Sequence, residues 1–289
     1  MFKNVIFGGS GFLGSNLADE ISKSKNKILI IDKKPKKVLK NFQKQINCDI
    51  LNLEKYKNLI STNSDVYFFS DIADIGYSKI YPLETLENNV LKLIHVLKFL
   101  IKKKINNFYY ASTIYVNNEL GSFYRASKQC AEIIISEFSK NYNFNYTFLR
   151  YGSVYGPQAQ EWNGIRKFVK EAIMKGKITY KGNGKELREY IHVKDAAKLT
   201  YTAVKSKKYS NKSILISGQS SLSSNELFTT IFEILNKKKK VKFLNKVVED
   251  HYGVTPYRYI PNQSKKIVPI DYIDIGQGII EVIKEINDK

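Results

Sequence analysis

The chain has 289 residues, of which 43% are hydrophobic and 13% aromatic, a composition that is typical of a globular protein and excludes a disordered one. The formal net charge is +20, but the lysines are scattered along the chain instead of forming one basic stretch, so we expect no nucleic-acid partner. No apolar run reaches the length of a membrane span, and the 2 cysteines and 3 histidines lack metal-ligand spacing, so we expect a cytoplasmic protein with no metal site and no membrane contact.

The first half of the chain alternates short runs rich in β-branched and aromatic residues with longer amphipathic segments. Predicted strands lie at 3–7, 27–31, 45–48, 65–69, 107–111 and 146–150. Predicted helices lie at 12–24, 54–60, 83–103 and 122–142. Such alternation is typical of βαβ units, so this half predicts an α/β fold, a Rossmann-type doubly wound parallel sheet with helices on both faces.

The regular alternation of strands and helices ends after Arg150, where a turn-rich segment follows at 151–157. Further predicted helices lie at 164–175, 192–205, 223–237 and 275–286, and further strands at 178–180, 187–191 and 214–217. We expect the last strand to return to the main sheet. The sequence thus predicts a cofactor domain at 1–157, with returns near 192–217, and a smaller α/β substrate lobe at 158–289.

A glycine-rich turn joins the first predicted strand to the first predicted helix. Gly8, Gly9, Gly11 and Gly14 satisfy both G-x-G-x-x-G and G-x-x-G-x-x-G. Glycines at this spacing allow a tight turn and the close approach of a pyrophosphate, which the N-terminus of the helix attracts. Because strand, motif and helix follow in the required order, the sequence predicts a dinucleotide cofactor.

Asp32 ends the second predicted strand, eighteen residues after Gly14. A carboxylate at this place is expected to accept hydrogen bonds from the ribose hydroxyls of adenosine and to repel a 2′-phosphate, which favours NAD over NADP. Lys33 and Lys34 follow immediately and weaken that preference for NAD. Asp49 and Ile50 end the third predicted strand and could flank the adenine, although Asp49 could equally be an ordinary loop residue.

Tyr124 and Lys128 stand four residues apart in the predicted helix 122–142. Positions i and i+4 lie on one face of a helix. An ammonium group there stabilises a phenolate, and such a tyrosine can accept and return a proton. In a chain with 20 tyrosines this spacing alone would arise by chance. The hypothesis of a catalytic pair is supported by the glycine turn, which predicts a matching cofactor site.

With these features the chain resembles the NAD-dependent epimerase/dehydratase family, the extended short-chain dehydrogenases that act on nucleotide sugars. The matching stretches are GGSGFLGSNL at 8–17, ENNV at 87–90, YASTIY at 110–115, YRASK at 124–128, LRYGSVYGP at 149–157 and GNGKELREYIHVKDAA at 182–197. The resemblance implies a tightly held NAD, a nucleotide-diphosphate-sugar substrate, a place in polysaccharide biosynthesis, and a homodimer that pairs the helices 83–103 and 122–142.

The resemblance also implies roles for individual residues. Tyr124 would be the acid/base, Lys128 would hold the nicotinamide ribose, and Thr113 or its neighbour Ser112 would hydrogen-bond the sugar hydroxyl. The residues implied to contact NAD are Gly8, Gly11, Phe12, Leu13, Gly14, Asp32, Lys33, Asp49, Ile50, Ser70, Asp71, Asn89, Tyr124, Lys128, Tyr151 and Val154. Those implied to contact the substrate are Thr113, Ser153, Asn163, Arg188, whose guanidinium suits a diphosphate, and Arg258.

Three stretches depart from the family pattern. The sequence FSDI at 69–72 stands where His-Leu-Ala-Ala is usual, so Asp71 and Asp74 are unexpected carboxylates beside the fourth strand. Asp71 could contact the cofactor, the sugar or solvent. The connection 113–124 is short, which predicts a more open substrate pocket, and Ser153 replaces a family asparagine that contacts the sugar.

One absence narrows the reaction. Thr113 is followed by Ile114 and Tyr115, where the 4,6-dehydratases of the family carry an Asp-Glu pair, so we expect no dehydration. The chain would then oxidise a ring hydroxyl, expected at C4, as a 4-epimerase or a 4-dehydrogenase, with a 4-ketoreductase as the alternative. A non-catalytic dinucleotide-sensing protein is the alternative from another class, and the retention of both Tyr124 and Lys128 argues against it.

Overall fold

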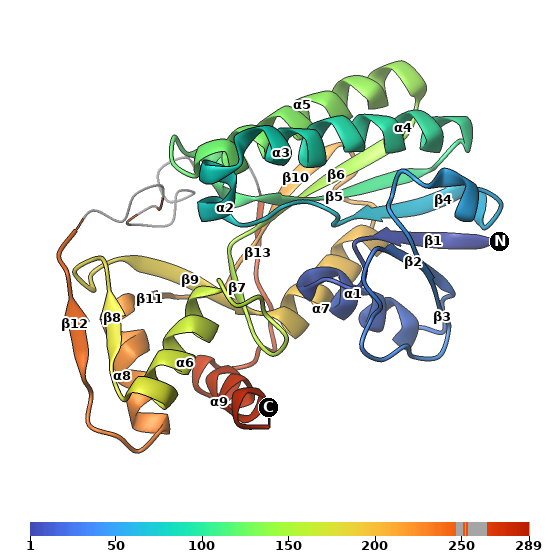
Figure 1. Ribbon diagram of the computed structural model, residues 1–289. Helices are drawn as coiled ribbons and strands as arrows, with labels where there is room; N and C mark the ends of the chain where they lie inside the picture. Colours follow the sequence, from blue (N-terminus) through green and yellow to red (C-terminus); the bar gives the residue numbers. More distant parts are fainter. Residues whose placement is uncertain (247–250, 252, 254–264, 289) are drawn as a thin grey trace.

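The computed structural model describes residues 1–246, 251, 253 and 265–288, and it is built around one eight-stranded sheet (Figure 1). The strand order is β13-β10-β6-β5-β4-β1-β2-β3, and every neighbouring pair is parallel. The strands are β1 (Phe2–Phe7), β2 (Ile28–Asp32), β3 (Gln43–Asn47), β4 (Ile60–Phe68), β5 (Asn107–Thr113), β6 (Asn145–Tyr151), β10 (Lys212–Ile216) and β13 (Lys265–Ile267). Their carboxyl ends therefore meet at one edge, where ligands of open α/β sheets bind.

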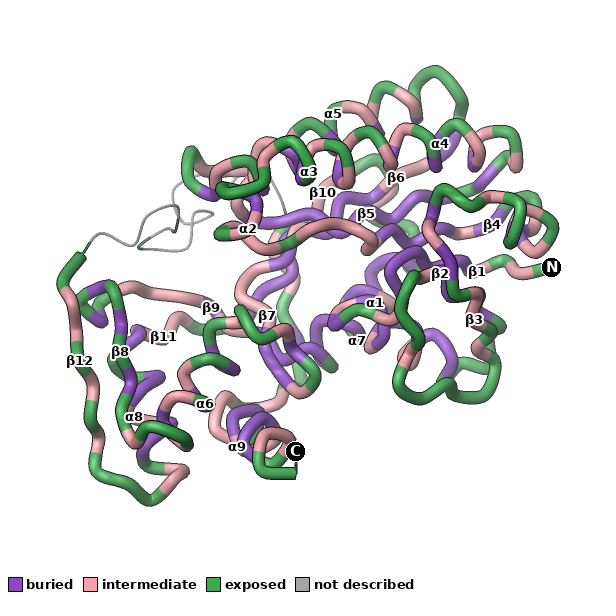
Figure 2. The backbone as a smooth tube through the Cα atoms, in the orientation of Figure 1, coloured by how far each residue is buried: buried purple, intermediate pink, exposed green. Residues whose placement is uncertain are grey.

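Helices cover both faces of this sheet. One layer holds α1 (Phe12–Lys23) packed on α7 (Val193–Lys205), and the other holds α2 (Ile75–Ile80), α3 (Pro82–Leu86), the π turn η2 (Glu87–Leu91), α4 (Lys92–Lys102) and α5 (Ser122–Tyr142). Residues 28–31 and 107–113 are buried without interruption, because a parallel sheet covered on both faces has no side toward water. Figure 2 shows this pattern as buried central strands beneath helices with exposed outer surfaces.

A smaller group of elements lies beyond the sheet edge. It contains a three-stranded sheet of β7 (Ser153–Tyr155), β9 (Leu187–His192) and β11 (Ser221–Ser223), and the pair β8 (Ile178–Tyr180) and β12 (Val241–Phe243). The helices α6 (Gly164–Lys175), α8 (Ser224–Ile234) and α9 (Ile275–Asn287) pack together around its own apolar core. None of the described helices is both long and apolar enough to cross a membrane.

The predicted doubly wound α/β fold is confirmed, and the helices predicted at 122–142 and 164–175 coincide with α5 and α6. The helix predicted at 54–60 is wrong, because only the 3₁₀ turn η1 (Leu53–Lys55) forms and β4 begins at Ile60. Tyr56 explains the difference. Its side chain is fully buried, with ring centroids 5.8 Å from Phe7 and 5.9 Å from Phe99, so tertiary packing overrides the local helical pattern. The edge strand β13 was not predicted.

Candidate functional site

The glycine turn joins β1 to α1 at the carboxyl edge of the sheet. Gly8 has a φ of +77°, and a Cβ on it would lie 2.5 Å from the carbonyl oxygen of Phe69. A Cβ on Gly14 would lie 2.3 Å from the carbonyl oxygen of Gly8, so only glycine lets α1 start this close to the strand. Gly11 is the N-cap of α1, and no side chain of the described residues caps the helix. The amides of its first turn, including those of Phe12 and Leu13, therefore fit a pyrophosphate.

Asp32 faces the same turn from the end of β2. Its Oδ2 accepts a hydrogen bond from the amide of Ser10 at 2.9 Å, and its Oδ1 accepts one from the amide of Lys34 at 3.0 Å. These two bonds fix the carboxylate beside the glycine turn, and its remaining lone pairs suit the hydroxyls of an adenosine ribose. The donors and acceptors of this end of the site fit NAD.

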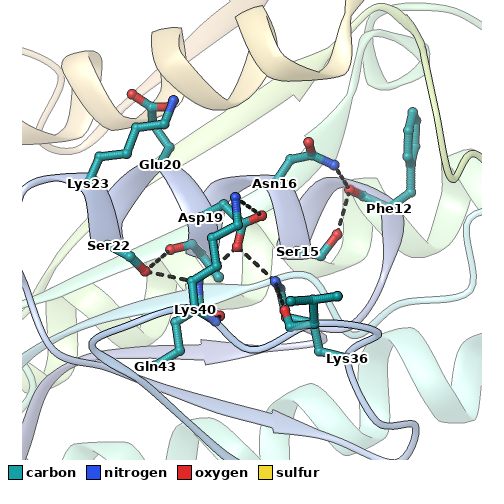
Figure 3. Close-up of polar contacts among 12 residues, drawn as sticks. Phe12, Ser15, Asn16, Asp19, Glu20, Ser22, Lys23, Lys36, Lys40 and Gln43 are labelled. Atoms are coloured by element: carbon teal, nitrogen blue, oxygen red, sulfur yellow. Dashed lines mark hydrogen bonds and ion pairs between the residues drawn. The ribbon is translucent and has the colours of Figure 1, made fainter. Parts of the chain in front are cut away.

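Two lysine side chains of the loop after Asp32 pair with other carboxylates. Lys36 Nζ pairs with Asp19 Oδ1 at 2.7 Å, and Gln43 donates to the same oxygen (Figure 3). Lys33 Nζ pairs with Asp49 Oδ2 at 2.8 Å, and the hydrogen bond to this carboxylate raises the pKa of Lys33. These two loop lysines are therefore neutralised by carboxylates, which makes them weaker partners for a 2′-phosphate.

Tyr124 and Lys128 lie on one face of α5, as the spacing predicts. Lys128 is buried, and its Nζ donates to the carbonyl of Ala111 and to Asp71 Oδ2, both at 2.6 Å. The ammonium lies 4.7 Å from the ring centroid of Tyr110 and 5.8 Å from that of Tyr124. The lysine thus stands between the end of β5 and the phenol of Tyr124, which is itself 9% exposed.

Asp71 belongs to this centre and does not face solvent. Its side chain is 3% exposed, and its Oδ2 accepts from both Lys128 Nζ and the Tyr110 hydroxyl, the latter at 2.7 Å. Burial, followed by the charge of Asp71, raises the pKa of Tyr110 well above its ordinary value, so the phenol stays protonated as a donor. Asp71 Oδ1 is also buried but has no hydrogen-bond partner within the described part of the chain. Asp74, in contrast, caps α2 by accepting from the Tyr77 amide.

Asn89 holds the loop that carries Asp71. Its Oδ1 accepts from the amide of Ile72 at 2.8 Å, and its Nδ2 donates to the Ile72 carbonyl and to the Ser127 hydroxyl. Both amide hydrogens of Asn89 are used in these bonds, and its contact with NAD stays a prediction. The side chain fastens residue 72 to α5 and thereby sets the position of Asp71.

Ser112 and Thr113 are adjacent on β5 but have different surroundings. The single hydroxyl hydrogen of Ser112 is donated to Glu132 Oε1 at 2.5 Å, and Glu132 in turn pairs with Arg150 at 2.6 Å. Thr113 Oγ1 accepts from the amide of Tyr115, which leaves its own hydrogen available to a ligand. The sequence left Ser112 and Thr113 as alternatives. It assigned no role to Glu132, which no motif marks, or to Arg150, although Arg150 lies in the matching stretch 149–157.

The remaining predicted contacts lie on several elements. Asn163 caps α6 and donates to the carbonyl of Val154 at 2.9 Å, so it joins β7 to α6. Arg188 lies in β9 opposite Leu222 of β11. Arg258 lies outside the described residues. The other members of the predicted set are the half-buried Ser153, the buried Ile50, Ser70, whose carbonyl accepts from Asn88, and Tyr151, whose hydroxyl bonds Thr200 at 2.7 Å.

The comparisons with known proteins agree with the observed fold and identify a family. The NAD dependent epimerase/dehydratase family matches residues 4–216. A putative UDP-glucose 4-epimerase of Methanocaldococcus jannaschii is 24% identical to this chain, and the match covers 96% of both chains. A dTDP-D-glucose 4,6-dehydratase of Dictyostelium discoideum is 26% identical, and the match covers 67% of this chain and 53% of the dehydratase. The crystal structure of UDP-glucuronic acid 4-epimerase from Bacillus cereus, in complex with UDP-glucuronic acid and NAD, has the same fold, with a TM-score of 0.84, 22% identity and 99% of both chains covered.

The close packing at Gly14 generates a first prediction. Gly14→Ala places a methyl group against the Gly8 backbone, so α1 must shift. We expect a loss of about 1–3 kcal/mol in the free energy of unfolding, the usual cost of overpacking, and weaker NAD binding, measured by denaturant titration and calorimetry. Gly164→Ala is the matched control, because its Cβ would meet only Phe168 at 3.6 Å. Parental stability and NAD affinity in Gly14→Ala would contradict the assignment of the turn.

Proposed function

Because the chain belongs to the NAD dependent epimerase/dehydratase family, we propose that it is a nucleotide-sugar 4-epimerase that oxidises and re-reduces C4 of a nucleotide-diphosphate sugar. The observation that carries the proposal is the buried Lys128 beside Tyr124, at the same sheet edge as the glycine turn. Relatives named as UDP-sugar 4-epimerases support the choice of reaction and of a UDP-sugar as substrate. A 4-dehydrogenase, which would release the ketone, and a 4-ketoreductase use the same residues.

Tyr124 performs the proton transfer in this proposal. As phenolate it takes the proton of the C4 hydroxyl, and as phenol it returns this proton to the ketone oxygen. The Lys128 ammonium stabilises the phenolate, since an opposite charge nearby favours the ionised form. Bound NAD would supply the hydride acceptor and donor. The proton and the hydride thus leave separate atoms of one alcohol and return to the same ketone, so no external reductant is consumed.

Thr113 is the residue that we propose to hold the reacting hydroxyl. The Ser112 hydrogen is committed to Glu132, whereas Thr113 retains a donor. The substrate is assigned to the lobe that follows β6, with Arg188 as the contact of the diphosphate, Ser153 in place of the family asparagine that contacts the sugar, and Arg258 as a further predicted contact of the substrate. A guanidinium suits a diphosphate because it donates two parallel hydrogen bonds.

Dehydration is not part of the proposed reaction. The positions after Thr113 are the buried Ile114 and the half-buried Tyr115, and the hydroxyl of Tyr115 is bonded to His251 Nδ1 at 2.8 Å. Neither residue supplies the carboxylate pair expected of a 4,6-dehydratase. Since one relative carries the name of a 4,6-dehydratase, loss of water is the outcome that the product analysis must distinguish.

We also propose that the enzyme is a homodimer formed through its outer helical layer. Ile80 of α2, Leu83 of α3 and Ile133 of α5 expose 70%, 75% and 63% of their surface. The three helices contact one another, so these side chains belong to neighbouring elements of one layer. Exposed apolar side chains grouped in this way are typical of a protein–protein interface.

The role of Tyr124 predicts that Tyr124→Phe lowers turnover by about 10²- to 10⁴-fold, because general acid–base catalysis is lost. NAD binding should persist, since the ring remains. The measurement is NMR of products from a panel of UDP-, GDP-, dTDP- and CDP-sugars, with Tyr142→Phe, at the exposed end of α5, as control. Unchanged turnover would remove Tyr124 from this role, and no conversion by the parent enzyme would favour a dinucleotide-sensing protein.

Thr113→Val and Ser112→Ala form a second matched test. We expect Thr113→Val to lower kcat/KM at least about tenfold, the value of one substrate hydrogen bond. Ser112→Ala should keep kcat/KM within about twofold while lowering the free energy of unfolding by about 1 kcal/mol, because Glu132 retains Arg150. Steady-state kinetics and denaturant titration measure both effects, and the reverse pattern would assign the sugar contact to Ser112.

The dimer interface predicts that Leu83→Glu combined with Ile133→Glu yields a monomer. Light scattering coupled to size exclusion should then report one chain mass of 33.3 kDa, whereas the parent should report twice that value. Ile270→Glu is the control, because this side chain is 93% exposed in the loop before α9, away from the proposed interface. A parent protein of single-chain mass would refute the interface.

A further inference from the structure

Only one oxygen of the Asp71 carboxylate accepts hydrogen bonds from the described residues. Its side chain is 3% exposed, and both donors that reach it, Lys128 Nζ and the Tyr110 hydroxyl, bond to Oδ2. Oδ1 is buried and accepts no hydrogen bond from any described residue. A buried acceptor without a donor costs about 1–3 kcal/mol, and more when it is charged. Such an atom in a candidate site points to a donor that arrives with a ligand.

The position of Asp71 identifies which ligand that is. The loop after β4 touches the glycine turn on one side, where the Phe69 carbonyl approaches Gly8 so closely that a Cβ would lie 2.5 Å from it. On its other side the loop pairs with Lys128, beside Tyr124. Asp71 therefore lies between the residues that fit the pyrophosphate and the residues that fit the reacting sugar. The part of NAD that must bridge this interval is the nicotinamide ribose, and its hydroxyls are donors.

We propose that Asp71 is a cofactor-binding residue whose Oδ1 accepts a hydroxyl of the nicotinamide ribose and whose charge makes the site prefer NAD⁺ to NADH. The proposal rests on the proposed function only for the place of the nicotinamide. It assigns to Asp71 an effect on the redox state of the cofactor that the Tyr124–Lys128 pair does not provide.

The charge preference follows from the ion pair. Lys128 Nζ lies 2.6 Å from Asp71 Oδ2, and the ammonium and the carboxylate together carry no net charge. Without Asp71, the Lys128 ammonium would be an unpaired cation in the same buried centre. The nicotinamide ring is positively charged when oxidised and neutral when reduced, so an unpaired ammonium would repel NAD⁺ and leave NADH nearly unaffected. Asp71 removes this repulsion and favours the form that can oxidise an alcohol.

The test is the affinity of Asp71→Asn for each cofactor form, measured by calorimetry on protein stripped of carried nucleotide and without sugar. We expect the Kd for NAD⁺ to rise about tenfold or more, in the range of one hydrogen bond to a charged group. The Kd for NADH should rise several-fold less, so that the ratio of the two Kd values increases about fivefold or more. A tenfold change in this ratio equals about 30 mV in the two-electron potential of the bound nicotinamide.

Three further variants separate charge from structural damage. Asp74→Asn makes the same substitution in the same loop at the cap of α2, and Tyr110→Phe removes a donor to Oδ2 but keeps the charge. Both should leave the ratio within about twofold of the parent. Asp71→Asn combined with Lys128→Met makes the centre neutral again, and the ratio should return toward the parental value.

The ribose contact and the charge preference of Asp71 would be refuted by different results. Parental affinity for both forms in Asp71→Asn would refute the ribose contact. An equal loss for NAD⁺ and NADH, or a ratio that the double variant does not restore, would refute the charge preference. Neither result depends on sugar turnover, so a failure of the proposed epimerase reaction would leave this binding test intact. If Asp71→Asn does not fold, Lys128→Met changes the net charge in the opposite sense by leaving the Asp71 carboxylate without its ammonium, and the ratio of the Kd for NAD⁺ to the Kd for NADH should then fall below the parental value. An unchanged ratio in Lys128→Met would refute the charge preference.

Discussion

The close approach of three backbone segments at the carboxyl end of β1 is the constraint on which the site depends. The amide of Gly8 donates to the carbonyl of Ile31 on one side, and the amide of Phe69 donates to the carbonyl of Phe7 on the other. These bonds extend the pairing of β1 with β2 and β4 into the turn. As a result the start of α1, the Asp32 carboxylate and the loop that carries Asp71 surround one narrow interval, which only glycine at positions 8 and 14 leaves open.

The second requirement is the neutralisation of the charges that α5 buries. Lys128 and Glu132 lie one turn apart on the helix and are 3% and 7% exposed. Buried charges are tolerated only when they are paired and hydrogen-bonded. The partners come from the sheet: Asp71 follows β4, and Arg150 belongs to β6. The sheet edge therefore does more than support α5, because it supplies the opposite charges that allow Lys128 and Glu132 to stay buried.

The features that sequence alone predicts are those whose cause is local. The glycine spacing, Asp32 at a strand end and the helical phase of Tyr124 and Lys128 can all be predicted from neighbouring residues. The helix expected at 54–60 failed because the burial of Tyr56 depends on distant aromatic rings. The alternatives left open for Asp71 have the same cause, since its partner Lys128 is 57 positions away and no pattern joins them. The division of the chain near residue 157 stays a prediction.

The Lys128–Asp71 pair also bears on the direction of the proposed reaction. A ketoreductase must start each turnover from the reduced nicotinamide, and an unpaired ammonium at the centre would serve it, because a cation there disfavours the oxidised ring. An epimerase or a dehydrogenase must start from the oxidised form, and it benefits when the Lys128 ammonium is paired with a carboxylate. Asp71 is that carboxylate. Among the reactions that Tyr124 and Thr113 can support, the buried carboxylate therefore favours those that begin with oxidation of the alcohol.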